Sequence, residues 1–175
     1  TRMSLNRIDT KISLLMKSLS EFYKQEEYIK EILPIIEQKS VISLRILDWF
    51  ITNYSKKYKT ITQKGEKEID IYQNYKLQLK SYSKSQFDPF CRKNKIEFYY
   101  KDDKYIETSC GQLCFFRWCF ENDILDYVKN NMATIEQDMK NSLKQKQVGK
   151  NRKKTIEPVN RSITKSNKKY IVRFD

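Results

Sequence analysis

The cysteines are the residues of this sequence with the most specific chemistry. Cys110, Cys114 and Cys119 lie close together, Cys91 lies upstream, and the chain contains no histidine. Thiolates bind zinc, and a structural zinc site needs four Cys or His ligands, commonly in close pairs. Cys114 and Cys119 flank the aromatic segment 115–118, however, and buried thiols behave as small hydrophobic side chains. We therefore expect buried free thiols and no metal, with a four-cysteine zinc site as the alternative.

Catalytic chemistry has few candidates in this composition. Without histidine there is no Ser–His or Cys–His pair, and the three glycines form no phosphate-binding loop. Four carboxylates could gather around magnesium, although nothing in their spacing singles them out: Asp48, Asp70, Asp88 and Glu97. Asp88 and Glu97 with Lys101 faintly resemble a nuclease arrangement, but such triplets arise by chance where 33% of residues are charged. The expectation is a protein that is not an enzyme and has no cofactor.

Positive charge is concentrated near the C-terminus. The chain has 35 Lys and Arg against 22 Asp and Glu, and of its formal charge of +13, residues 140–175 carry +10. The first 139 residues are nearly neutral, at +3. A lysine or arginine that meets a phosphate releases condensed counterions, which supplies affinity without reading a base sequence. The C-terminal segment is therefore expected to bind a phosphate-rich polymer.

The predicted phosphate contacts form two clusters in this segment and one short basic run in the body. The segment 150–154 is the densest cluster, 165–169 is the second, and the run in the body begins at Arg92. The expected nucleic-acid-binding residues are Lys150, Arg152, Lys153, Lys154, Arg161, Lys165, Lys168, Lys169, Arg92 and Lys93.

Three functions are compatible with such a basic segment. We favour a non-enzymatic nucleic-acid-binding protein of low sequence specificity, with DNA as the expected partner. The alternative is a structural or assembly protein whose basic arm docks on an acidic protein. A segment that serves only solubility or targeting is the third. Self-association into a homo-oligomer stays open.

The segments that would position these residues are mainly helical. Recurrence of apolar side chains at spacings of three and four predicts helices over residues 8–23, 26–38, 41–57, 69–82, 112–120 and 122–139. Pro34 should bend the second helix, and Ser40 is expected to cap the third.

Two segments have the composition of turns and strands. Residues 96–100 and 105–109 alternate around a polar turn and are rich in β-forming side chains, which predicts a β-hairpin. Residues 59–67, with Gly65, predict a loop or a small hairpin. Within the first hairpin we expect Phe98 and Tyr100 to face the core, and Trp49 and Trp118 to be core residues as well. The orientation of Tyr99 stays open.

The predicted organisation is one domain followed by an arm. The fold class is α+β: a mainly helical domain with a β-hairpin over residues 1–147, and a basic, largely extended C-terminal arm over 148–175. The segment 170–174 alternates again and could end the arm as a strand. No apolar N-terminal segment indicates secretion, and no run approaches the ~18 apolar residues of a membrane span. No membrane partner is expected.

Four strings of this sequence resemble a known pattern. They are SLRILDWFITNYSKK (43–57), FDPFCR (87–92), GQLCFFRW (111–118) and KKYIVRFD (168–175). Together they resemble an uncharacterised protein family of nucleocytoplasmic large DNA viruses, the giant viruses. The resemblance implies a viral protein in the reducing cytoplasm or the nucleus of a host cell, with packaging in the virion as a further option. It implies no activity and no catalytic residues.

Overall fold

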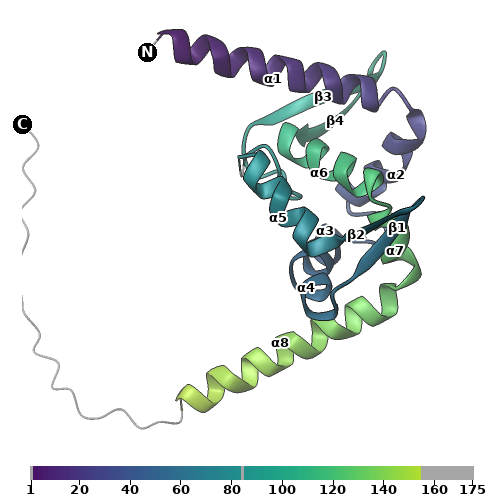
Figure 1. Ribbon diagram of the computed structural model, residues 1–175, viewed down its shortest axis with the longest axis vertical. Coiled ribbons are helices and arrows are strands. Elements are labelled where there is room, and N and C mark those ends of the chain that lie inside the picture. The colour runs from purple at the N-terminus through teal and green to yellow at the C-terminus, as the bar shows by residue number, and fades with distance from the viewer. Residues whose placement is uncertain (1, 84, 155–175) are drawn as a thin grey trace, which may run out of the picture. The chain divides into compact units, whose positions relative to one another are not determined.

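A computed structural model of the chain describes residues 2–83 and 85–154, and the side chains of residues 11–83 and 85–148 (Figure 1). The described part is mostly helical and contains two antiparallel two-stranded sheets, which confirms the predicted α+β class. The chain divides into two units, residues 1–140 and 141–175. The predicted boundary, between residues 147 and 148, lies seven residues further along.

Most elements follow one another with short connections, and the longest connection, residues 82–94, joins α5 to β3. In order they are α1 (Arg2–Phe22), α2 (Glu26–Ile36), α3 (Leu44–Trp49), the π-helical turn η1 (Phe50–Tyr54), α4 (Ser55–Tyr58), β1 (Ile61–Lys64), β2 (Lys67–Asp70), α5 (Ile71–Ser81), β3 (Lys95–Lys101), β4 (Lys104–Ser109), α6 (Cys110–Glu121), α7 (Ile124–Asn130) and α8 (Met132–Lys154). Strand β1 pairs with β2, and β3 pairs with β4. The hairpin predicted over residues 96–109 is therefore present, and of the two alternatives for residues 59–67 the structure has the small hairpin.

The third predicted helix is interrupted by a wider turn. It begins at Leu44, and its cap is Ser43, whose Oγ accepts the N–H three residues on at 3.2 Å. The predicted cap, Ser40, instead accepts the N–H two residues on, as in a turn. In and just after η1 the hydroxyls of Thr52 and Ser55 donate to the carbonyls four residues earlier, each at 2.7 Å. Such bonds compete with the backbone ladder and accompany local widening of a helix.

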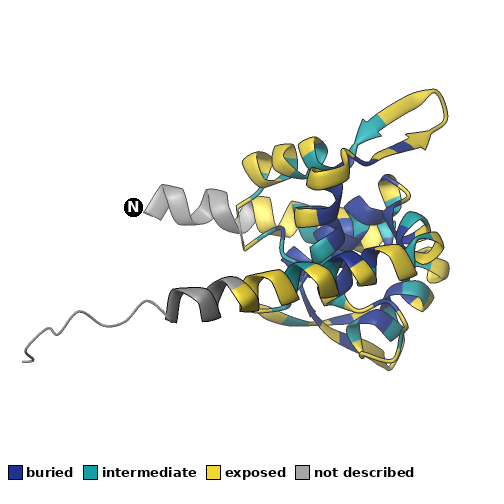
Figure 2. Cartoon of the chain, turned by 90° about the horizontal axis from the view of Figure 1, so that it is seen from below, coloured by how far each residue is buried: buried dark blue, intermediate teal, exposed yellow. Residues whose placement is uncertain are grey.

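Helix α6 is the centre of the core. It is apolar nearly all round, as expected for a helix enclosed by other elements, and its buried residues are Gly111, Gln112, Leu113, Cys114, Phe115, Phe116, Trp118 and Cys119. The hydroxyl of Tyr23, just after α1, donates to the Leu113 carbonyl at 2.7 Å, and the indole of Trp118 donates to Asn74 in α5 at 2.7 Å. Figure 2 shows the buried residues gathered inside, with exposed residues on the outer sides of the helices.

Phe98 and Tyr100 face the core as predicted, and the orientation of Tyr99, which the sequence left open, is toward solvent. Phe98 is buried, Tyr100 is half-buried, and Tyr99 is 56% exposed. Trp118 is fully in the core, whereas Trp49 is only half-buried. The alternation along β3 therefore places one face of the hairpin on the core.

The last predicted helix, 122–139, is in fact two helices. Asn131 leaves helical geometry (φ −118°, ψ 19°) between α7 and α8. Its side-chain amide donates to the Tyr127 carbonyl at 2.9 Å, a local bond of the kind by which asparagine interrupts helices. Val128 and Ile135, on either side of the break, are both buried. The apolar spacing therefore continues across Asn131, and periodicity predicted one helix where there are two.

Helix α8 continues to Lys154, so residues 148–154, which were predicted to be extended, are helical. The apolar periodicity does end, but lysine, arginine and glutamine have high helix propensity, and no proline occurs between the start of α8 and Pro158. The rest of the predicted arm, including the strand at 170–174, lies outside the described residues. No helix in the described part is long and apolar enough to cross a membrane.

The carboxylate of Asp138 links the first turns of α8 to α3 and α4. It is buried, and accepts hydrogen bonds from Trp49 Nε1 at 3.1 Å, Lys57 Nζ at 2.8 Å and the Tyr58 hydroxyl at 3.1 Å. Burial raises the pKa of Asp138, but the hydrogen bonds from Lys57, Trp49 and Tyr58 outweigh it, so the pKa is lowered overall. The hydrogen bond with Asp138, aided by one with Tyr58, raises the pKa of Lys57 to about 12.

We expect Asp138→Ala to lower the free energy of unfolding by about 2–3 kcal/mol at neutral pH, because it leaves the Trp49 and Tyr58 donors without their acceptor. The control is Glu136→Ala, which removes an exposed ion pair with Lys140 and should cost less than about 1 kcal/mol. Urea titration measures both.

The pH dependence of this difference has a defined sign. A carboxyl whose folded-state pKa is lowered stabilises the fold above its ordinary value of 3.8 and loses that contribution as the pH falls through the folded-state pKa. The difference between wild type and Asp138→Ala should therefore shrink below pH 3.8. A difference that grows in acid would contradict this assignment.

Candidate functional site

The predicted phosphate-binding residues of the C-terminal segment are only partly within the described structure. Lys150, Arg152, Lys153 and Lys154 belong to the last turns of α8, and their side chains are not among those described. Arg161, Lys165, Lys168 and Lys169 lie outside the described residues. The phosphate contacts predicted for these eight residues stay predictions.

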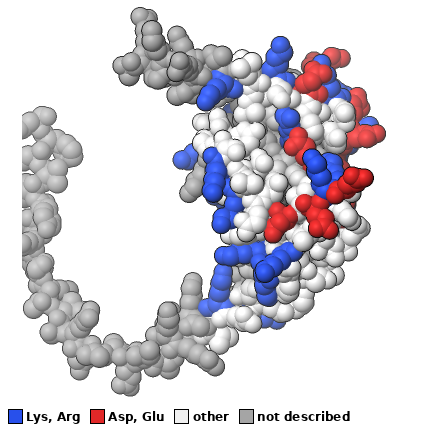
Figure 3. Space-filling model, in the orientation of Figure 1, with Lys and Arg blue, Asp and Glu red and all other residues white. Residues whose placement is uncertain are grey.

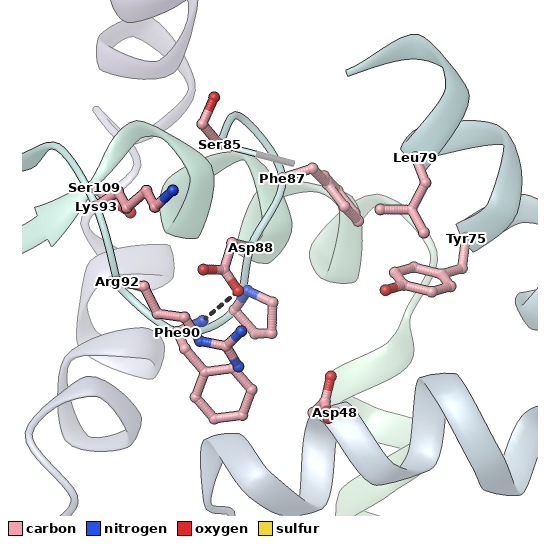
Figure 4. A pocket seen from close by; sticks show the side chains of 11 residues that line it. Asp48, Tyr75, Leu79, Ser85, Phe87, Asp88, Phe90, Arg92, Lys93 and Ser109 are labelled. Carbon is pink, nitrogen blue, oxygen red and sulfur yellow. Dashed lines mark hydrogen bonds between the residues drawn. The ribbon is translucent and has the colours of Figure 1, made fainter. Parts of the chain in front are cut away.

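Arg92 and Lys93 line a pocket of about 380 Å³ (Figure 4). Its walls come from α3, from α5, from the segment 85–93 and from the end of β4. The lining residues are Asp48, Tyr75, Leu79, Ser85, Phe87, Asp88, Pro89, Phe90, Arg92, Lys93 and Ser109. Both basic side chains are exposed, and the guanidinium carbon of Arg92 lies 4.7 Å from the centre of the Phe90 ring.

The segment that carries these cations is held against α6 by buried hydrogen bonds. Gln112, 1% exposed, donates from Nε2 to the Pro89 carbonyl at 2.8 Å and accepts from the Thr108 hydroxyl at 2.7 Å. The Asp88 N–H donates to the Gly111 carbonyl at 3.2 Å. The Asp88 carboxylate accepts the Phe90 N–H at 3.2 Å, the dashed line in Figure 4, and so closes a local turn. The loop is therefore positioned by backbone contacts as well as by its own side chains.

The close approach of this loop to α6 requires glycine at position 111. A Cβ atom there would lie 2.7 Å from the Ser85 carbonyl oxygen and 3.3 Å from the Asp88 nitrogen. Both atoms belong to the backbone, which cannot turn aside as a flexible side chain would. A side chain at this position must push the loop away from α6.

The pocket places two carboxylates close to one guanidinium. Burial raises the pKa of Asp48, the Arg92 charge opposes this in part, and the Asp88 charge adds to it. Burial also raises the pKa of Tyr75, and the charges of Asp48 and Asp88 raise it further. The interior thus offers acceptors for hydrogen-bond donors of a ligand, while Arg92 and Lys93 offer positive charge to an anion.

Only two of the four carboxylates named from the sequence come together here. Asp48 and Asp88 share the pocket. Asp70 instead caps α5, and Glu97 accepts a hydrogen bond from the Tyr99 hydroxyl at the surface. Lys101 forms an ion pair with α2 at 3.3 Å, so the nuclease-like triplet is not assembled. Within the described residues, no group of three or more Cys, Asp or Glu side chains could hold a metal ion.

The cysteines considered as zinc ligands are free thiols in the described structure. Cys114 and Cys119 are buried in the core, and burial raises the pKa of the Cys119 thiol. A hydrogen bond with Cys110 and burial together raise the pKa of Cys114. Thiols in this environment stay protonated and pack as small apolar groups.

Sequence reasoning did not identify Tyr75, Gly111 or Gln112 as parts of the site. One signal could have found the last two, since the strings 87–92 and 111–118 both carry the family resemblance and are the two segments that meet here. Asp48, in the string 43–57, faces the same pocket. Three of the four strings therefore converge on one place.

Residues 5–171 match the model of DUF7197, a family of unknown function, and the chain belongs to this family. It is also similar to Uncharacterized protein L507 of Acanthamoeba polyphaga mimivirus, with 42% identity over 142 residues. That alignment covers 76% of this chain and 55% of the relative, so the chain spans about half the length of the protein it matches. The resemblance to an uncharacterised giant-virus family is thereby confirmed. No solved structure matches the chain.

We expect Gly111→Ala to lower the free energy of unfolding by about 2–3 kcal/mol, because the added methyl meets backbone that can move only with the loop. The matched control is Gly65→Ala. Gly65 has φ +62° and no atom within 4 Å of a Cβ, so only local backbone strain of about 1 kcal/mol is expected. Urea titration of both variants compares the two costs. An equal loss in both would contradict the close approach at Gly111.

Proposed function

We propose that this chain is a non-enzymatic nucleic-acid-binding protein of low sequence specificity, which contacts phosphates through its basic C-terminal segment. The observation that carries the proposal is the charge of +10 over residues 140–175, against +3 for the rest of the chain. DNA is the expected partner, as a duplex of any sequence.

The charge pattern within α8 supports an external anionic partner. The helix has Glu136 and Asp138 in its first turns, and Glu136 pairs with Lys140 at 3.0 Å. From Asn141 to Lys154 the sequence has six basic residues and no acidic one. The acidic residues of α8 thus lie near its start and most of its basic residues lie near its end, which concentrates positive charge at that end. Such a surface has a strongly positive potential and attracts a polyanion.

The alternative is a virion structural or assembly protein whose basic segment docks on an acidic protein. Both functions depend on the same charges, so salt dependence does not separate them. The identity of the partner does. Crosslinking in cells that express the chain should recover nucleic acid, and recovery of an acidic protein in its place would support the alternative.

We expect the C-terminal segment to contribute about −5 to the slope of log K against log salt when wild-type protein binds random-sequence duplex DNA, if the segment engages about six phosphates. Replacement of Lys150, Arg152, Lys153 and Lys154 by glutamine should flatten the slope by about 3.6, at ~0.9 per lost contact. Glutamine has high helix propensity, so the helix should persist. Fluorescence anisotropy at several salt concentrations measures the slope.

The control removes the same charge from elsewhere on the protein. Lys24, Lys39, Lys67 and Lys95 are exposed, and their replacement by glutamine should change the slope by less than about 1. If the two variants bind duplex DNA equally well, the C-terminal segment is not the contact and the proposal fails.

A further inference from the structure

Three lysines on α4 and α5 have no counter-charge in the described structure. Lys56 lies in α4, Lys76 and Lys80 lie in α5, and all three are exposed. None forms an ion pair with a described carboxylate. Helix α5 itself contains no acidic residue. Lys57, one residue after Lys56, is different, because Asp138 neutralises it.

The ring of Tyr72 brings two of these cations together. Lys56 Nζ lies 5.5 Å from its centre and Lys76 Nζ lies 5.6 Å from it. A tyrosine ring attracts ammonium groups through its quadrupole but carries no charge to cancel theirs. Two like charges drawn to one ring repel each other, and an anion placed between them relieves that repulsion.

The lysines form a row beside the pocket of Arg92 and Lys93. Tyr72, Lys76 and Lys80 are four residues apart and share one side of α5, with about 6 Å of helix rise between neighbours. Tyr75 and Leu79, which line the pocket, occupy the adjacent side of the same helix. Figure 3 shows basic side chains on the left, where Figure 1 places α5 and α4, and acidic side chains mainly on the right.

We propose that Lys56, Lys76 and Lys80, which we name the α5 lysine row, form a phosphate-binding surface on the folded body that contacts the backbone of the bound nucleic acid. This inference rests on the proposed function, and adds a contact surface outside the C-terminal segment. Lysine is suited to the role, since it binds phosphate as a flexible point charge without fixing a base sequence.

The first test replaces Lys56, Lys76 and Lys80 by glutamine in the full chain and measures binding to random-sequence duplex DNA by anisotropy. The log–log salt slope should flatten by about 2.7, at ~0.9 per lysine. A matched variant, with Lys24, Lys39 and Lys95 replaced by glutamine, removes the same charge from exposed lysines that pair with carboxylates. Its slope should change by less than about 1. Equal slopes in the two variants would overturn the inference.

The variant in which glutamine replaces Lys150, Arg152, Lys153 and Lys154 distinguishes a contact through the α5 lysine row from a contact through the C-terminal segment. If it keeps the wild-type slope while the α5 row variant loses slope, the row is the contact and the proposed role of the C-terminal segment fails. If only the C-terminal variant loses slope, the row is overturned and the proposed function stands. Thermal unfolding of each variant checks that the fold is retained.

A second measurement needs no variant. Acetylation of lysines on the wild-type protein, read by mass spectrometry, should slow at Lys56, Lys76 and Lys80 when duplex DNA is bound. Lys24, Lys39 and Lys95 should react at unchanged rates. Equal rates at the row with and without DNA would overturn the inference. Protection by polyglutamate as strong as that by DNA would also overturn it, since the row would then not favour phosphate.

Discussion

The buried amide of Gln112 is the contact on which the candidate site depends. Its two polar ends join the Pro89 carbonyl to the Thr108 hydroxyl, and so tie the loop before β3 to the junction of β4 and α6. Loss of this amide would leave two buried polar groups unpaired, each at a cost of about 1–3 kcal/mol. Gly111, in the preceding position, allows the backbones to approach closely enough for the bond to form. Arg92 and Lys93 are thus carried by a loop whose position is set inside the core.

The charges of the described body fall into two groups with different roles. Some are neutralised within the fold, as Lys57 is by the buried Asp138 and Lys129 is by Glu31. Others, on α4 and α5, have no carboxylate partner among the described residues. The first 139 residues have a net charge of only +3, yet their basic and acidic side chains are not evenly distributed over the surface. That separation is the basis on which we propose a second anion-binding surface on the folded body.

Periodicity predicted the existence and type of the elements better than their ends. The apolar spacing of residues 41–57 indicated one helix, but the hydroxyls of Thr52 and Ser55 bond to backbone carbonyls and accompany a π-helical turn. The same spacing runs across Asn131, where the chain breaks because the asparagine amide bonds locally. Both errors have one cause: side-chain hydrogen bonds to the backbone act on single residues, whereas periodicity averages over a dozen.

The sequence by itself determined the α+β class, the hairpin over residues 96–109 and the concentration of charge after residue 139. It favoured buried thiols at Cys114 and Cys119, and it left residues 59–67 as a loop or a small hairpin. These follow from composition and local spacing, which act along the chain. Only the tertiary structure decided that Asp48 and Asp88 share a pocket with Arg92, and that Lys56 and Lys76 approach the same tyrosine ring. Asp48 and Arg92 are 44 residues apart in the sequence and Lys56 and Lys76 are 20 apart, so their proximity depends on how separate helices pack together. Local sequence patterns do not predict which distant residues become neighbours, because that depends on how all the side chains of the core pack together.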